Sequence, residues 1–117
     1  MRKENYVLEF RLRFPDPKGD AFGPGKADLL ERIGEAGSIR AAASAMEMSY
    51  NRAWMLVRSM NLLFETPLVT STRGGNTGGG ATLTSLGSTV LAHYRRMEKA
   101  CAKACAQDWA ALQRVIR

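Results

Sequence analysis

Side chains that can pair with the edges of nucleic-acid bases lie close together near the middle of the chain. The candidate set is Ser49, Tyr50, Asn51, Arg52, Met55 and Arg58. Arginine pairs with guanine O6 and N7, asparagine pairs with adenine N6 and N7, and apolar side chains contact the thymine methyl group. Each good pair discriminates between bases by about 1–3 kcal/mol. We expect this set to contact double-stranded DNA, with Arg52 the first candidate for a base or backbone contact.

Further side chains are suited to the DNA backbone, which is bound by cations and by backbone N–H groups. Arg58, Arg40 and Arg73 are candidates for flanking phosphates. The run from Gly74 to Gly80 holds five glycines in seven residues, and its first four positions complete the set: Gly74, Gly75, Asn76 and Thr77. A nucleotide-binding loop would need Gly-Lys-Ser or Gly-Lys-Thr before a helix, which is absent here. The run is therefore interpreted as the tip of a hairpin whose backbone approaches a phosphate chain or a minor groove.

Three short helices are predicted around the candidate set. Apolar residues at helical spacing indicate a first helix over residues 26–36, closed by Gly37. Ser38 and Ser49 are suitable N-caps for a second helix with small alanines and for a third helix that carries the candidate set. Trp54 falls on the apolar stripe of the third helix, where we expect it in the core. Two helices joined by a tight break are typical of a helix-turn-helix.

The flanking segments complete the predicted fold, a mainly helical winged helix-turn-helix with a small β wing. Residues 67–73 and 81–84 are predicted to form the two strands of a wing directly after the third helix. Alternating residues over 6–14 predict an N-terminal half-buried strand. We assign residues 1–84 to the DNA-binding domain.

Residues 85–117 are predicted to form one long helix, part of the same structural unit, that needs a partner for its far end. We therefore expect a homodimer. Its candidate contacts are Val90, Tyr94, Met97, Cys101, Cys105 and Leu112.

Composition narrows the function classes. The chain has 117 residues, a formal net charge of +6 and an isoelectric point near 9.8, which favours polyanionic partners. A single histidine, no clustered carboxylates and no nucleophile motif argue against an enzyme. Neither a signal peptide nor an 18-residue apolar stretch is visible, so we expect a cytoplasmic protein without membrane contact. No cofactor is expected.

Several segments together resemble a known family. They are Gly23–Leu30, Gly37-Ser38-Ile39, Ala41-Ala42-Ala43, Met48-Ser49-Tyr50, Arg52-Ala53-Trp54, Met60-Asn61, Pro67-Leu68-Val69 and the glycine-rich run from Gly74 to Thr84. The combination is similar to the N-terminal DNA-binding domain of the ModE family of molybdate-responsive regulators. The similarity to LysR-type regulators is weaker and broader.

The resemblance implies operator binding by homodimers and regulation of molybdenum-related genes. Family members continue into a molybdate-binding module, whereas this sequence ends at Arg117. The expectation is a regulator without that module, for which a separate molybdate-binding protein is a conceivable partner. Asn51 stands where the family often has a basic residue, so the family's operator is not carried over.

Two other readings stay open. His93, Met97, Cys101 and Cys105 are spaced by four and form a stripe of soft ligands that suits a metal or redox sensor. A winged helix can also serve as a protein-interaction module without touching DNA.

Overall fold

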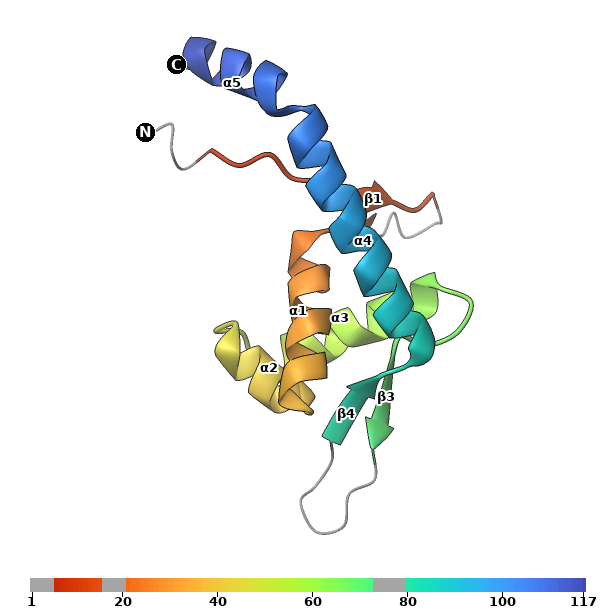
Figure 1. Ribbon diagram of the computed structural model, residues 1–117. Coiled ribbons are helices and arrows are strands. Elements are labelled where there is room, and N and C mark those ends of the chain that lie inside the picture. The colour runs from red at the N-terminus through yellow and green to blue at the C-terminus, as the bar shows by residue number, and fades with distance from the viewer. Residues whose placement is uncertain (1–5, 16–20, 73–79) are drawn as a thin grey trace.

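The computed structural model describes residues 6–15, 21–72 and 80–117, and Figure 1 shows its arrangement. In chain order the elements are β1 (Leu12–Arg13), β2 (Ala21–Phe22), α1 (Pro24–Ala36), α2 (Ile39–Ala45), α3 (Tyr50–Leu63), β3 (Val69–Thr72), β4 (Gly80–Leu83), α4 (Ser85–Ala104) and α5 (Ala106–Val115). Helices dominate, and the strands form two separate two-stranded antiparallel sheets. The predicted fold class, mainly helical with a small β wing, is confirmed.

Local sequence signals set the ends of the first three helices. Pro24 starts α1, and Gly37 ends it in the left-handed conformation at φ 76°, which glycine adopts without steric cost. The side-chain oxygen of Ser38 accepts a hydrogen bond from the N–H of Ala41 at 3.0 Å. Ser49 caps α3 in the same way through the N–H of Arg52 at 3.1 Å. Both predicted N-caps are therefore confirmed.

The core lies where α1, α2, α3, α4 and the β3–β4 hairpin meet. Its fully buried apolar members are Phe22, Ala27, Leu29, Leu30, Ile33, Ala42, Ala53, Met60 and Leu68. Small side chains on α2 and α3 allow close approach, as the sequence predicted from its run of alanines. This packing holds α2 and α3 as a rigid pair, with Glu47 at φ 55° in the turn between them.

The β3–β4 hairpin follows α3 and is fixed to the helices at both strands. β3 pairs with β4 from Val69↔Leu83 to Thr72↔Gly80. The N–H of Ala81 donates to the carbonyl of Gly37 at 2.9 Å, which joins β4 to the turn between α1 and α2. The hairpin projects from the base of the domain in Figure 1.

The predicted N-terminal strand over residues 6–14 is wrong in extent. Only Leu12 and Arg13 pair, with Phe22 and Ala21 of β2. A strand needs a hydrogen-bonding partner along its whole length, and the alternating pattern cannot supply one. Phe10, Leu12 and Phe14 still pack against the core as the pattern predicted, but Leu8 is 44% exposed.

The single long helix predicted from residue 85 to the C-terminus is also wrong. Cys105, at φ −96° and ψ 0°, separates α4 from α5, and Figure 1 shows the change of direction. The hydrophobic repeat continues through this residue, so the pattern could not reveal a change of backbone angles at one position. The domain is elongated, with extents of 56 × 29 × 26 Å, because α5 and the end of α4 extend beyond the core.

Candidate nucleic-acid interface

Helix α3 turns one face to the core and the opposite face outward. Ala53, Val57 and Met60 are buried. At about 100° per residue, the outward face is centred on the side opposite to them. The exposed residues on it are Asn51, Met55, Arg58 and Leu62, and both Met55 and Leu62 are 66% exposed. This face therefore carries an amide, a guanidinium and two apolar side chains, which together suit contacts with base edges. Leu62 was not among the predicted site residues, although it lies two turns after Met55 on the same face of α3.

Two aromatic residues lie along the flank of α3 that faces the β3–β4 hairpin, and each lies under an arginine. The Cζ atom of Arg40 lies 4.5 Å from the centroid of the Tyr50 ring. The Cζ atom of Arg58 lies 5.7 Å from the centroid of the Trp54 ring. Such cation–π contacts restrict the arginine before any ligand binds.

The prediction that Trp54 is a core residue is wrong, since 44% of its surface is exposed. Position 54 is at the edge of the apolar stripe of α3, beside Ile39, Ser71 and Ala81, with which it lines a groove. The indole ring is too large to be covered there by the small residues of α2 and β4. Trp54 thus belongs to the surface around the outward face.

Arg52 lies on the other flank of α3. It is exposed and lines a cavity together with Arg11, Arg13 and Lys26 from the N-terminal segment and α1. The structure therefore separates Arg52 from Arg58, although both belong to the predicted candidate set. Lys26 was not among the predicted site residues, because its position at the start of α1 is far from α3 in sequence.

Asn61 holds the hairpin against α3. Its side-chain oxygen accepts hydrogen bonds from the N–H groups of Leu68 at 2.8 Å and Val69 at 3.1 Å. Its side-chain nitrogen donates to the carbonyl of Val69 at 3.1 Å. The hairpin therefore has a fixed position next to the outward face. The predicted contacts Arg73, Gly74, Gly75, Asn76 and Thr77 lie outside the described residues.

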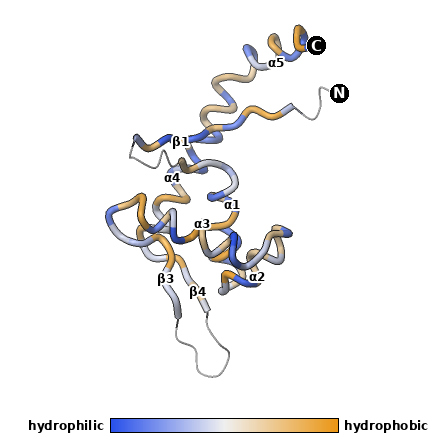
Figure 2. Tube along the Cα trace, turned by 180° about the vertical axis from the view of Figure 1, so that it is seen from behind, coloured by the Kyte–Doolittle hydropathy of each residue, from blue (hydrophilic) through white to orange (hydrophobic). Residues whose placement is uncertain are grey.

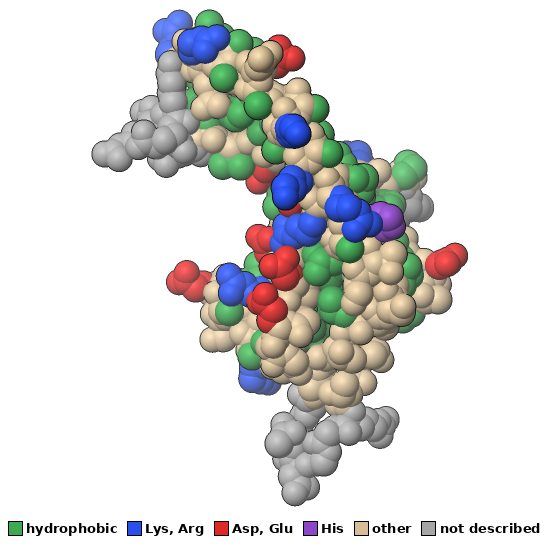
Figure 3. Space-filling view, in the orientation of Figure 1, with side chains coloured by type: hydrophobic (Ala, Val, Ile, Leu, Met, Phe, Trp, Pro, Cys, Tyr) green, Lys and Arg blue, Asp and Glu red, His purple; other side chains and the backbone are tan. Residues whose placement is uncertain are grey.

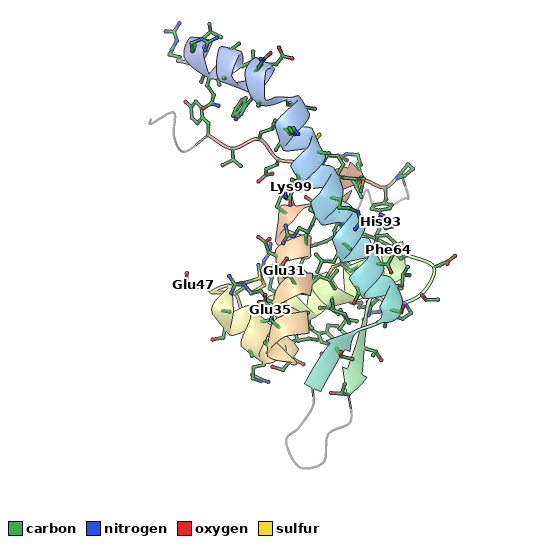
Figure 4. All side chains as sticks on the ribbon, viewed as in Figure 1. Glu31, Glu35, Glu47, Phe64, His93 and Lys99 are labelled. Carbon is green, nitrogen blue, oxygen red and sulfur yellow. The ribbon has the colours of Figure 1, made fainter. Side chains whose placement is uncertain are left out.

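Charge is divided between two sides of the domain. Between Arg40 and Met97 the sequence has Glu47 and Glu65 as its acidic residues, and neither is on the outward face of α3. Acidic side chains gather instead over α1, as Figure 3 shows, and Figure 4 labels Glu31 and Glu35 there. Arg95 on α4 pairs with Asp28 at 2.7 Å and with Glu31 at 3.1 Å, which offsets part of this negative charge.

The predicted dimer contacts divide into core residues and exposed residues. Tyr94 was wrongly assigned to a dimer contact, because it is 1% exposed and its hydroxyl donates to the carbonyl of Phe10 at 2.5 Å. Val90 also packs against the core of its own domain. This half of α4 covers α1 and β2, which the helical repeat alone could not show. Met97 and Leu112 are 40% and 56% exposed. Cys101 and Cys105 are half-buried free thiols.

The far end of the molecule, beyond the core, exposes a second group of apolar side chains. Its exposed members are Val7, Leu8, Met97, Leu112 and Val115. No described residue of α5 is buried, although this helix carries Trp109, Leu112 and Val115. We call this group the distal apolar surface. A separate group of exposed apolar side chains lies on α3 and consists of Tyr50, Trp54, Met55 and Leu62.

The stripe of soft ligands does not form a closed metal site within the described chain. The guanidinium of Arg96 donates to Nδ1 of His93 at 3.0 Å. In the part of the chain that the structure describes, no three His, Cys, Asp or Glu side chains come together as metal ligands. None of the helices described combines the length and apolar character needed to cross a membrane.

The arrangement defines a winged helix-turn-helix domain of the kind found in DNA-binding proteins. A solved structure with this fold is the DNA-binding domain of CbnR, determined in complex with DNA. The TM-score is 0.58 at 20% sequence identity, and the match covers 75% of this chain and 95% of that domain. The likeness establishes the fold.

Sequence comparison adds similarity to several proteins of known name, although no protein-family model matches the chain. The molybdenum-pterin-binding protein MopB of Rhodobacter capsulatus is 44% identical over 85 residues, 73% of this chain and 32% of MopB. The molybdenum transport protein ModE of Azotobacter vinelandii is 39% identical over 88 residues, 75% of this chain and 33% of ModE. The transcriptional regulator ModE of Haemophilus influenzae is 32% identical over 102 residues, 85% of this chain and 37% of that protein.

These relatives confirm the resemblance to the ModE family that the sequence motifs indicated. The chain spans about a third of the length of these relatives.

Proposed function

We propose that this chain is a sequence-specific DNA-binding transcriptional regulator that acts as a homodimer. The observation that carries the proposal is the outward face of α3. Asn51, Met55 and Arg58 are exposed on one side of a rigid helix, next to a hairpin fixed by Asn61. A helix of this kind fits the major groove, where each base pair presents a distinct pattern of donors, acceptors and methyl groups.

The side-chain positions indicate which residues contact bases and which contact phosphates. Asn51, Met55 and Arg58 read base edges, since they point away from the core. Arg40 at the start of α2 and Arg52 on the flank contact phosphates, and the β3–β4 hairpin follows the backbone on its own side. The acidic side chains over α1 keep that side of the domain away from the DNA by charge repulsion.

The distal apolar surface supports the homodimer. Leu112 and Val115 on α5 are 56% and 78% exposed. A contiguous group of exposed apolar side chains marks an interaction surface more often than an idle one. A second copy of the chain could cover it, and a two-fold pair would place two α3 helices on successive major grooves of one duplex face. Each copy would then read one half of a palindrome.

The molybdenum link comes from the relatives. MopB is described as molybdenum-pterin-binding, and ModE as a molybdenum transport protein or a transcriptional regulator. We propose that the genes under control are molybdenum-related, and that a molybdate signal, if used, is sensed outside the domain described above.

Selection from a random duplex library tests the function. The purified chain is incubated with the library at about 150 mM salt, which suppresses binding through phosphates alone. We expect enrichment of a palindrome whose half-sites lie about 10 base pairs apart, or a multiple of that distance.

The matched variants are Arg58→Ala, which should lower the enrichment, and Lys99→Ala on α4, which should leave it intact. A folded wild-type dimer that enriches no sequence would contradict the proposal and favour the protein-interaction module.

A further inference from the structure

A basic cavity lies on the flank of α3 that is turned away from the β3–β4 hairpin. Its volume is about 520 Å³, and the β1–β2 ribbon, the start of α1 and the first half of α3 form its walls. Four cationic side chains line it: Arg11, Arg13, Lys26 and Arg52. They come from three different elements, so folding brings together charges that are distant in sequence. We call this group the ribbon cavity.

The guanidinium of Arg11 packs over the start of α1. A Cβ atom added to Gly23 would lie 3.3 Å from Cγ, Nε and Cζ of Arg11. Gly23 therefore provides the space in which this side chain lies. The first turn of α1 carries no acidic residue, although acidic side chains are favoured at this positive end of a helix. The local charge thus stays positive.

Lys26 ties the walls of the ribbon cavity together. Its Nζ atom donates to the carbonyl of Ala21 in β2 at 2.6 Å and to the hydroxyl of Ser59 in α3 at 3.1 Å. The ribbon is thereby held against the side of α3. These hydrogen bonds fix the walls of the cavity relative to each other, so the cavity is part of the folded structure.

Within the described chain, few carboxylates offset these charges. Glu9 pairs with Arg11 at 3.1 Å, and both side chains are about half exposed. Neither Arg13 nor Arg52 forms an ion pair with a described residue. A cluster of like charges is costly unless an anion neutralises it, and a multiply charged polyanion does so best.

The position of the ribbon cavity relative to α3 indicates which polyanion binds in it. At about 100° per residue, Arg52 lies about 60° around α3 from Met55, so the cavity borders the outward face. Trp54 and the hairpin lie on the other side of that face. Figure 2, seen from behind, shows α3 between β1 and the β3–β4 hairpin.

We propose that the ribbon cavity binds the phosphate backbone of the DNA whose major groove α3 occupies. The inference rests on the proposed function and extends it. The hairpin follows one strand at one edge of the groove, and the β1–β2 ribbon acts as a second wing at the other edge. Arg52 then contacts phosphate, and its contribution is independent of base sequence.

Salt dependence of binding tests this directly. Kd for the selected duplex is measured from low to moderate salt with wild type, the double variant Arg13→Gln/Arg52→Gln and the control Arg96→Gln/Lys99→Gln. Each lost phosphate contact lowers the slope of log Kd against log salt by about 0.9. Because the proposed dimer carries both arginines in each of its two copies, we expect a loss of about 3.6 for the cavity variant and none for the control, which removes the same charge from α4.

A second measurement shows where the contact falls. Duplexes with single uncharged methylphosphonates at successive positions should weaken wild type at the flanking phosphates of each half-site and leave the cavity variant unaffected there. Wild type and cavity variant with equal slopes would overturn the second wing while the proposed function stands. If wild type binds no duplex, both the second wing and the proposed function are contradicted.

Discussion

The side chain of Asn61 on α3 exchanges two hydrogen bonds with the backbone of Val69 on β3, both at 3.1 Å. A third bond, from the N–H of Leu68, ends on the same side-chain oxygen at 2.8 Å. Leu68 and Val69 are both buried, so water cannot replace these bonds. One amide therefore connects α3 to the first strand of the hairpin.

Replacing Asn61 by alanine should destabilise the domain. Each buried backbone group left unpaired costs about 1–3 kcal/mol. We expect the loss in unfolding free energy in urea, together with weaker binding to the selected duplex because the hairpin loses its position. Asn61→Asp keeps the acceptor oxygen and loses the donor, so it should cost less than Asn61→Ala. Equal losses in the two variants would contradict this account of the site.

Arg58 and Arg52 should differ in what they contribute to binding. Arg58 lies on the outward face, and we expect Arg58→Ala to reduce the ratio of affinities for selected and scrambled duplexes by about 5- to 150-fold for each half-site, equivalent to about 1–3 kcal/mol per contact. Arg52→Ala should weaken both duplexes by the same factor. Competitive binding with the two duplexes measures both effects. A loss of selectivity in Arg52→Ala alone would return Arg52 to base contact.

Local signals in the sequence were sufficient for the centre of the fold. Ser38, Ser49 and Gly37 define helix ends through their own side chains or backbone freedom, and these choices need no distant partner. Two short strand-like segments on either side of a glycine-rich run likewise located the hairpin. The extent of the N-terminal strand and the break at Cys105 depend on distant partners or on one residue's backbone angles, and the periodicity of the sequence contains neither.

The exposure of several candidate residues was predicted from the sequence, whereas their arrangement in space was not. Tyr50, Asn51, Met55 and Arg58 are exposed on or beside the outward face, as expected. Trp54 was predicted to be a core residue and is exposed, whereas Tyr94 was predicted to be a dimer contact and is buried in the core. Both lie at the margins of apolar stripes, where the neighbouring elements decide burial. The ribbon cavity could not be foreseen, because its walls meet only through tertiary packing.

Tyr94 should make stability depend on pH in the alkaline range. Burial raises the pKa of Tyr94 from 10.0 to about 12, and the nearby carboxylate of Glu98 adds to the effect. The folded state therefore holds the phenol proton more tightly than the unfolded state. This contribution is fully present below pH 10 and is lost as pH rises to about 12, by about 1.4 kcal/mol per pH unit.

Urea unfolding at about pH 9 and about pH 11.5 measures this effect, with Tyr94→Phe as the reference that lacks the phenol. The difference in stability between wild type and variant should shrink at the higher pH. A constant difference would show that the proton on Tyr94 is not linked to folding.

Gly87 should tolerate no side chain. A Cβ atom there would lie 2.1 Å from the carbonyl oxygen of Leu68, a backbone atom that also accepts the N–H of Thr84 at 2.9 Å. Gly87→Ala forces α4 away from β3 and should cost about 1–3 kcal/mol. Gly25→Ala is the matched control, since nothing lies within 4 Å of its added Cβ and alanine favours the helix by about 0.5–1 kcal/mol. Thermal unfolding of both variants should give shifts of opposite sign.

Leu112→Glu should convert the proposed dimer to a monomer without unfolding the domain. Leu112 is 56% exposed on a helix with no buried residue, so a charge there costs little within one chain. Buried between two copies, the same carboxylate would lose its hydration, which is costly. Sedimentation equilibrium measures the mass, and circular dichroism checks that the helices remain. Leu62→Glu, on the outward face of α3, is the control that should stay dimeric while losing DNA affinity. A Leu112→Glu variant that stays dimeric would place the interface elsewhere. A wild-type chain that is monomeric would contradict the homodimer, and the palindrome expected from selection would then have no basis.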